Sequence, residues 1–160
     1  MSSYVRLGLT VASSVLLMYG ITYLTSFDII DHAYFSETRA FVSLLMGCTM
    51  IVVMMAYMPS MYPDRRANIC IVAGAFLVFT GILYLLRSQV TVDDVDYMEA
   101  MIPHHSIAIL TSERAQIDDP RVRNLADQII RAQRLEISEM KALIDDLRGG
   151  PAATPEIDGR

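Results

Sequence analysis

The chain has 160 residues, of which 53% are hydrophobic and 19% are charged, and its formal net charge is −5. A mean hydropathy of +0.37 is too high for an ordinary soluble domain and indicates membrane segments. The acidic balance, with no basic cluster, argues against a nucleic-acid partner.

Three apolar segments are each long enough to cross a bilayer as a helix, which takes about 20 residues. They cover residues 7–25, 40–58 and 67–86. A cleaved signal peptide is the alternative for the first segment, but only Arg6 precedes it and no small-residue cleavage site follows it. We therefore expect residues 1–87 to form a membrane domain of three transmembrane helices that contacts the lipid bilayer.

Basic residues in the short loops predict the orientation of these segments. Arg6 precedes the first segment, and Arg65 with Arg66 lies between the second and the third. Arg39 and Arg87 lie on the opposite side. Loops that carry more Lys and Arg usually stay in the cytoplasm. This predicts a multi-pass protein of the bacterial inner membrane, with a cytoplasmic N-terminus and a periplasmic C-terminal domain.

Methionines recur every four residues in the second segment, at Met46, Met50, Met54 and Met58. A thioether ladder that passes metal through the membrane is one interpretation. A flexible apolar packing face is the other. We favour packing, because no ionisable residue inside a segment marks a transport pathway.

Two cysteines, Cys48 and Cys70, lie in different segments. The helical rise places them at depths that differ by roughly 13 Å. A disulfide requires Cα atoms within about 7 Å of each other. We expect both residues to be small buried hydrophobic side chains.

Residues 88–150 predict an antiparallel helical hairpin, so the fold class is all-α. Thr91, three residues before Asp94, is typical of a capping box at the start of the first helix. This helix should run to about Gln116, with a defect at Pro103, which has no backbone N–H.

The second hairpin helix has clear boundary signals. Asp119 is suited to the N-cap and Pro120 to the first helical position. The helix should run to about Arg148, where Gly149 and Gly150 end it. Residues 151–160 are expected to be a disordered tail.

Potential metal ligands gather on one face of the first hairpin helix. Met98, Met101, His104 and His105 share about a 120° arc. Imidazole suits copper, zinc and iron, whereas a thioether selects the softer copper(I) ion. The pattern predicts a metal site, with a polar core network around the two histidines as the alternative.

The second hairpin helix presents a matching face. Gln133, Glu136 and Met140 fall within an apolar stripe. The stripe consists of Leu125, Ile129, Ile137, Ile144 and Leu147. A carboxylate in a buried stripe is costly unless it is paired. In a hairpin that turns near Asp118, His105 faces Gln133, Met101 faces Ile137 and Met98 faces Met140.

Other metals fit this ligand set less well. Zinc prefers Cys, His and carboxylate ligands. A di-iron centre in a helical bundle uses Glu-x-x-His motifs, which this sequence lacks. His32, which lies near Asp28 and Asp31 in the first loop, is expected to be a solvated residue, with bending over the site as the alternative.

These residues carry a family resemblance. The run 97–109 and the downstream runs 126–133 and 136–140 are similar to domain-of-unknown-function family 305. That family includes periplasmic copper-binding proteins of the CopM type with a ferritin-like helical fold. The resemblance covers about residues 93–147, in one copy of the motif pair, after a membrane region.

The resemblance implies roles for particular residues. It implies copper-ligand candidates at Met98, Met101, His104, His105 and Met140. It implies that Gln133 and Glu136 either bind the ion or orient a histidine.

The sequence thus predicts a membrane-anchored periplasmic copper-binding protein for tolerance, storage or delivery, without enzymatic activity. The alternative is a structural accessory subunit of a membrane complex, with the hairpin as a docking surface. A two-helix hairpin is too small to bury both its helices. We therefore expect a homo-oligomer or a larger complex.

Overall fold

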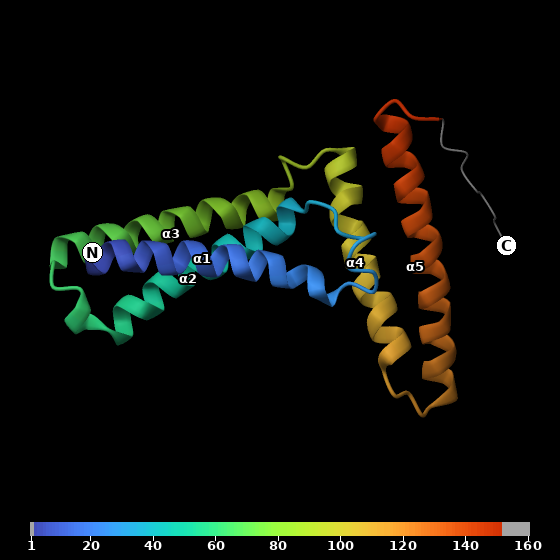
Figure 1. Ribbon diagram of the computed structural model, residues 1–160, viewed down its shortest axis with the longest axis horizontal. Coiled ribbons are helices and arrows are strands. Elements are labelled where there is room, and N and C mark those ends of the chain that lie inside the picture. The colour runs from blue at the N-terminus through green and yellow to red at the C-terminus, as the bar shows by residue number, and fades with distance from the viewer. Residues whose placement is uncertain (1, 152–160) are drawn as a thin grey trace. The chain divides into compact units, whose positions relative to one another are not determined.

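The computed structural model describes residues 2–151, which form helices and connecting loops without any strand. The helices are α1 (Ser3–Ile21), α2 (Glu37–Tyr57), α3 (Arg65–Ser88), α4 (Asp94–Arg114) and α5 (Pro120–Leu147) (Figure 1). Short 3₁₀ helices cover Thr22–Thr25 and Pro59–Met61. The all-α prediction is confirmed. The predicted disorder of residues 151–160 lies, apart from Pro151, outside the described residues.

The chain divides into two compact units. One comprises Met1–Thr22 and Glu37–Thr91, and we call it the span unit. The other comprises Tyr23–Ser36 and Val92–Arg160, and we call it the hairpin unit. The sequence predicts a boundary near residue 87, but it does not predict that the loop 23–36 belongs to the hairpin unit.

The three helices of the span unit are each long and apolar enough to cross a membrane. The 3₁₀ turn at Thr22–Thr25 extends the first of these segments. Few side chains along the three helices are buried, as is usual for surfaces that contact lipid. The helices fit a multi-pass membrane protein.

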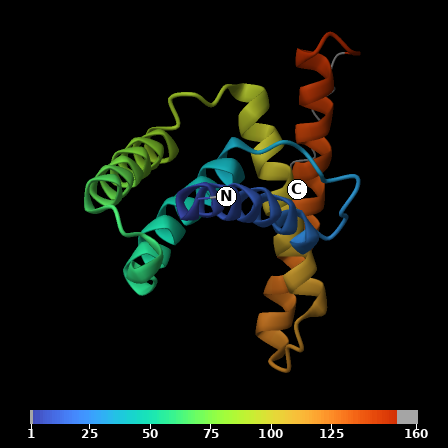
Figure 2. The same cartoon turned by 60° about the vertical axis from the view of Figure 1, so that its left-hand side comes forward.

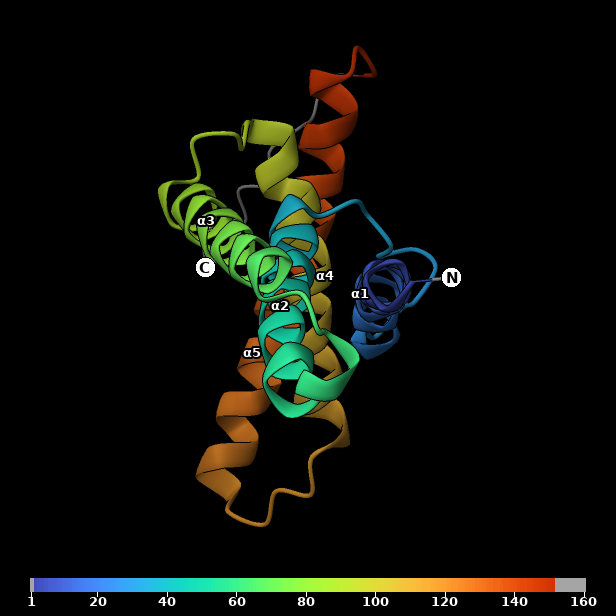
Figure 3. The ribbon, with the colours of Figure 1, turned by 90° about the vertical axis from the view of Figure 1, so that its left-hand side faces the viewer.

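Helix α2 packs against both α1 and α3, and Figure 3 shows it between them. Small residues make the contact with α1 close. A Cβ atom on Gly47 would lie 2.5 Å from Cγ2 of Val15. A larger residue at this position would force the Val15 side chain to shift, so glycine permits the observed approach of the two helices. Ser43, one turn away, is also buried.

The sulfur-containing residues of the span unit differ in burial. Both cysteines are free, which confirms the absence of a disulfide. Cys48 is buried as predicted, but Cys70 is exposed, so its part of α3 is not covered by other residues in the range 2–151. Met46 and Met58, at the two ends of the methionine repeat, are also exposed, so the repeat does not form one buried row along α2.

Helix α4 begins later than the predicted capping box. The side chain of Asp93 accepts a hydrogen bond from the N–H of Asp96, and the Asp96 side chain accepts one from the N–H of Asp93. The prediction of Thr91 and Asp94 is therefore wrong by two residues. The Thr91 hydroxyl instead donates to the carboxylate of Glu37 at 2.9 Å. The helix continues through Pro103, which is buried.

Helices α4 and α5 form the predicted antiparallel hairpin (Figure 1). Helix α5 begins at Pro120, and the carboxylate of Asp119 accepts from the N–H of Arg121, so this predicted cap is confirmed. Gly149 follows the helix with φ of 86°, a left-handed conformation that suits glycine.

Five buried side chains form the core of the hairpin: Met98, Ile102, Ile109, Ile137 and Ile144. The buried face of α5 differs from the predicted stripe. Ala126 is buried, whereas Leu125, Ile129 and Leu147 are exposed. The contact with α4 therefore uses only the Ile137–Ile144 side of the wide apolar face, and the other side has no partner within residues 2–151.

Candidate metal-binding site

His105 is held by contacts to both of its ring nitrogens. Its Nε2 lies 2.7 Å from a carboxylate oxygen of Glu136 on α5. Its Nδ1 lies 3.0 Å from the backbone carbonyl of Met101, one turn earlier on α4. One nitrogen must leave its partner before it can bind an ion. The other contact would then fix the orientation of the ring, which is the usual arrangement around a metal-bound histidine.

His104 lies next to this ring but is exposed to solvent. The two ring centroids are 6.1 Å apart, in an edge-to-face arrangement. That separation is on the scale of two imidazoles sharing one ion, since each ligand nitrogen lies about 2 Å from a bound metal. Met101 is partly buried and is a neighbour of both histidines on the helix surface. We call Met101, His104 and His105 the outer donor group.

The remaining predicted sulfur donors lie in the core. Met98 is 7% exposed and belongs to the buried cluster, and Met140 packs against that cluster. Both thioethers are thus on the apolar side of the hairpin, whereas His104 is exposed. The structure divides the predicted ligands into the outer donor group and this interior pair, Met98 and Met140.

The predicted polar residues of α5 lie beside the outer donor group. The side-chain amide of Gln133 donates to a carboxylate oxygen of Glu136 at 3.3 Å. The same oxygen contacts His105. The partner of His105 is therefore Glu136, about one turn beyond the residue that the simple hairpin register places opposite it. The Glu136 side chain is 48% exposed, so this carboxylate is paired and also hydrated.

The donor set is mixed in chemistry and in burial. Within residues 2–151, no three His, Cys, Asp or Glu side chains gather into a group that could hold a metal ion. The outer donor group instead combines two imidazoles with one thioether, and the interior pair adds two more sulfurs. Nitrogen with thioether sulfur suits copper(I) in donor type.

Residues 23–36, which connect α1 to α2, fold onto the hairpin (Figure 2). The hydroxyl of Ser106 accepts a hydrogen bond from the backbone N–H of Phe27 at 2.7 Å and lies 2.8 Å from Nδ1 of His32. His32 is only 8% exposed, so the prediction of a solvated loop histidine is wrong. Its hydrogen-bond partner, Ser106, follows His105 directly in the chain and lies on the core side of α4.

Further contacts fix this loop. Lys141 of α5 forms an ion pair with Asp31. The guanidinium of Arg134 lies 5.7 Å from the ring centroid of Phe27. Tyr34 packs against the buried cluster of the hairpin. The loop is therefore part of the hairpin unit through apolar, ionic and hydrogen-bonded contacts.

The sequence contains a signal for this docking that was missed. Ser106 occupies the core face of α4 between Ile102 and Ile109, and it is fully buried. A buried hydroxyl needs a hydrogen-bond partner. No residue of the two hairpin helices was predicted to supply one, which points to a partner from another segment.

The environment of His32 favours its neutral form. Burial lowers the pKa of the His32 imidazole, and the nearby positive charge of Lys141 acts in the same direction. The carboxylates of Asp31 and Asp28 oppose this shift. The lowered pKa means that acid acts against the docked state of the loop.

Comparison with known proteins places this sequence in a family. Residues 85–156 match the family described as "Domain of unknown function (DUF305)". A protein of Acanthamoeba polyphaga mimivirus, "Uncharacterized protein L153", is 36% identical over 105 residues, which cover 64% of this chain and 67% of the relative. The chain belongs to the DUF305 family. No solved structure matches the chain.

The DUF305 match contains the whole α4–α5 hairpin and all the predicted ligands. The alignment with the mimivirus protein covers more residues than lie between the start of the family match, at residue 85, and the last residue of the sequence. It therefore also includes residues of α3. The resemblance seen in the motifs of α4 and α5 is thus confirmed at the level of the family.

Proposed function

We propose that this DUF305 protein is a membrane-anchored copper-binding protein whose hairpin unit holds the ion outside the bilayer, for copper tolerance, storage or delivery. The observation that carries the proposal is the outer donor group. One imidazole is fixed between Glu136 and the Met101 carbonyl, and a second imidazole and a thioether lie beside it. When bound, copper would provide a soft centre that these nitrogen and sulfur atoms hold.

The chain's own residues have distinct roles in this proposal. His105 and His104 would bind the ion through nitrogen, and Met101 would add sulfur. Release of the Met101 carbonyl contact would free Nδ1 of His105, while Glu136 would keep the ring in place through Nε2. The interior pair, Met98 and Met140, would add softer ligands if side-chain rotation brings them toward the histidines.

The span unit and the loop charges support the proposed location. The three apolar helices anchor the chain in a bacterial inner membrane. The end of the span unit that carries Arg6, Arg65 and Arg66 lies on the cytoplasmic side, because loops rich in Lys and Arg usually stay there. The hairpin unit then lies on the periplasmic side.

Copper titration of the full-length protein in mild detergent tests the function. With a chromophoric chelator as competitor under reducing conditions, the wild-type protein should bind copper(I) in a fixed ratio to chain. His104→Ala/His105→Ala should abolish tight binding and preserve helicity. Met101→Leu, which removes the sulfur but keeps the side-chain size, should weaken binding by about tenfold or more.

One control variant and one positioning variant make this test specific. Met46→Leu removes an exposed thioether of α2 and should leave binding unchanged. Glu136→Gln keeps the shape of the side chain and removes its charge, and loss of such an orienting group typically weakens metal binding 10–100-fold. Stoichiometric copper binding by the double histidine variant would show that the outer donor group is not the site.

We propose a second role, assembly, from the uncovered face of α5. Apolar side chains on that face are largely exposed: Val122, Leu125, Ile129, Leu143 and Leu147. A second copy would bury them as a four-helix bundle, and a larger membrane complex is the alternative. Light scattering in mild detergent should give the mass of a homo-oligomer, and Leu125→Glu/Leu147→Glu should give a monomer. Consistent co-purification with larger proteins, without copper, would favour an accessory subunit.

A further inference from the structure

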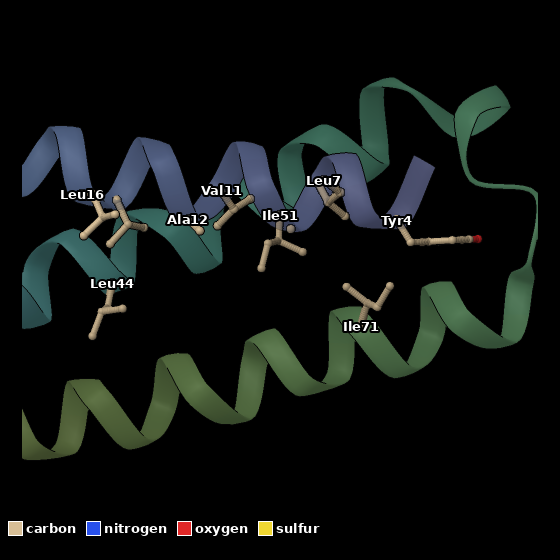
Figure 4. A pocket seen from close by; sticks show the side chains of 10 residues that line it. Tyr4, Leu7, Val11, Ala12, Leu16, Leu44, Ile51 and Ile71 are labelled. Carbon is tan, nitrogen blue, oxygen red and sulfur yellow. The ribbon is translucent and has the colours of Figure 1, made fainter. Parts of the chain in front are cut away.

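Apolar grooves flank α2 in the span unit, and two of them have nearly equal volumes. The first, about 620 Å³ in volume, opens between α1, α2 and α3, with the side chains of α1 and α2 turned toward Ile71 of α3 (Figure 4). The second, about 630 Å³, opens between α2 and α3. The two grooves differ at their polar ends. Tyr4 provides the one hydroxyl of the first groove, whereas Arg65 and Asn68 line the second.

Small side chains keep the second groove open. Ala56 of α2 and Ala73 of α3 line it, and larger apolar residues lie around them. Along α3 the groove extends from Arg65 to Phe76, a length of roughly 16 Å at the helical rise of about 1.5 Å per residue. This is about half of the ~30 Å hydrocarbon core of a bilayer. The groove therefore matches one leaflet in length.

The end of the span unit at this groove is positively charged. The hydroxyl of Tyr4 lies 3.0 Å from Oδ1 of Asn68 and accepts from the N–H of Asp64, so the starts of α1 and α3 are tied together. Arg6, Arg65 and Arg66 lie within a few residues of these contacts and are exposed.

The acidic side chain next to these arginines in the chain, that of Asp64, is already engaged. Asp64 caps α3, accepting from the backbone N–H groups of Arg66 and Ala67. No ion pair within residues 2–151 involves Arg6, Arg65 or Arg66. These guanidinium groups can thus bind an anion without losing an ionic partner inside the protein.

We propose that the groove between α2 and α3 binds an anionic phospholipid, with one acyl chain along Ala56 and Ala73 and the phosphate at Arg65. Guanidinium binds phosphate with paired hydrogen bonds, and a groove with an apolar length and a cationic end is complementary to such a lipid. The positive-inside rule explains basic residues in this loop but not an arginine that lines an apolar groove. The proposal rests on the anchoring of α1, α2 and α3 in a bilayer and is independent of copper.

Native mass spectrometry of the full-length protein, released from detergent with added lipid, tests the proposal. Phosphatidylglycerol should be retained in preference to phosphatidylcholine of the same chain length. Arg65→Gln should weaken phosphatidylglycerol binding by about tenfold, the effect expected when a charge-assisted contact is lost, and should remove the preference. Ala73→Leu fills the groove and should lower retention of both lipids.

Matched variants elsewhere in the span unit serve as controls. Arg87→Gln removes an exposed charge at the other end of α3, and Ala12→Leu fills the first groove instead. Neither should change the preference for phosphatidylglycerol. Ala56→Leu fills the second groove from α2 and repeats the test if Ala73→Leu does not fold. Circular dichroism checks the helicity of every variant.

Two results would overturn this assignment. The first is equal retention of the two lipids, or of neither, by the wild-type protein. The second is an equal loss of binding in the control variants and in Arg65→Gln and Ala73→Leu. Copper titration of the same samples keeps the two proposals separate, because lipid binding does not require the histidines and copper binding does not require Arg65.

Discussion

The two units of this protein are held together by different interactions. In the hairpin unit, a buried apolar cluster is surrounded by polar contacts between segments that are distant in sequence, such as Ser106 with Phe27 and Lys141 with Asp31. In the span unit, a smaller apolar cluster of Leu7, Met55 and Tyr62, the close approach at Gly47 and the polar contacts of Tyr4 join helices that bury few of their side chains.

This difference fits a span unit in lipid and a hairpin unit in water. Lipid is as apolar as the side chains of the span helices, so burying them against one another gains little, and close backbone packing decides the arrangement. In water, the hairpin must bury its apolar faces and provide partners for its buried polar groups. The loop 23–36 does both, which explains why it belongs to the hairpin unit although it connects two span helices.

The largest effect should come from the core of the hairpin unit. Ile102 is completely buried, so Ile102→Ala should lower the free energy of unfolding of this unit by about 2–5 kcal/mol. Hydrogen exchange of the full-length protein in detergent would measure this as faster exchange in α4 and α5. Leu135→Ala, at an exposed position of α5, is the control and should change little. Equal loss of protection in α1, α2 and α3 would mean that the two units do not unfold separately.

The span unit should be most sensitive at its closest helix contact. Gly47→Leu forces a side chain against Val15, and overpacking of this kind costs about 1–3 kcal/mol. The expected result is a lower melting temperature of the span helices in detergent, with exchange in α4 and α5 unchanged. Gly81→Leu introduces the same side chain where nothing lies within 4 Å, and it should be neutral. If both variants behave alike, close packing at Gly47 does not hold α1 and α2 together.

A smaller effect is expected where the loop meets the hairpin. Ser106→Ala removes the acceptor of the Phe27 N–H and the partner of His32, and an unpaired buried donor costs about 1–2 kcal/mol. Exchange at Phe27 and proteolysis within residues 27–33 should both become faster, with little change in the rest of α4. Thr111→Ala is the matched control, because the Thr111 hydroxyl donates to backbone carbonyls of its own helix. An unchanged loop in Ser106→Ala would show that apolar contacts alone hold it.

Sequence patterns predicted the helices better than they predicted the contacts between them. Length and hydropathy were enough to place α1, α2 and α3, and Asp119 with Pro120 marked the start of α5. These signals are local, since they depend on neighbouring residues alone. The predictions of the buried face of α5 and of the residue opposite His105 differ from the structure, because both depend on the rotation of one helix against another. The periodicity of a wide apolar face does not determine that rotation.

The candidate site shows the same limit. Helical spacing correctly placed Met101 and His105 one turn apart, and the structure joins them through the Met101 carbonyl. Spacing also assigned His104 to the shared arc, although its side chain is exposed. His32 is buried where it contacts Ser106, which lies about seventy residues further along the chain. No local pattern encodes such a contact. Ser106, a polar residue in the apolar face of α4, was the available signal that another segment docks there.

The smallest predicted effect is a pH dependence of loop docking. Because the pKa of His32 is lowered by burial and by Lys141, the docked loop binds fewer protons than the free loop below the unfolded-state pKa of 6.5. The stability that the neutral ring contributes is therefore complete above about pH 6.5. It decreases as the pH falls through that value toward the pKa of the folded state.

Hydrogen exchange of the loop between pH 7.5 and pH 5, corrected for the intrinsic pH dependence of exchange, measures this effect. The wild-type loop should lose protection as the pH falls, and His32→Gln should lose this dependence while keeping a polar side chain opposite Ser106. His104→Gln, which changes an exposed histidine of the same unit, should retain it. If the dependence disappears in His104→Gln but persists in His32→Gln, then acid acts through the outer donor group, and the buried ring does not control the docking of the loop.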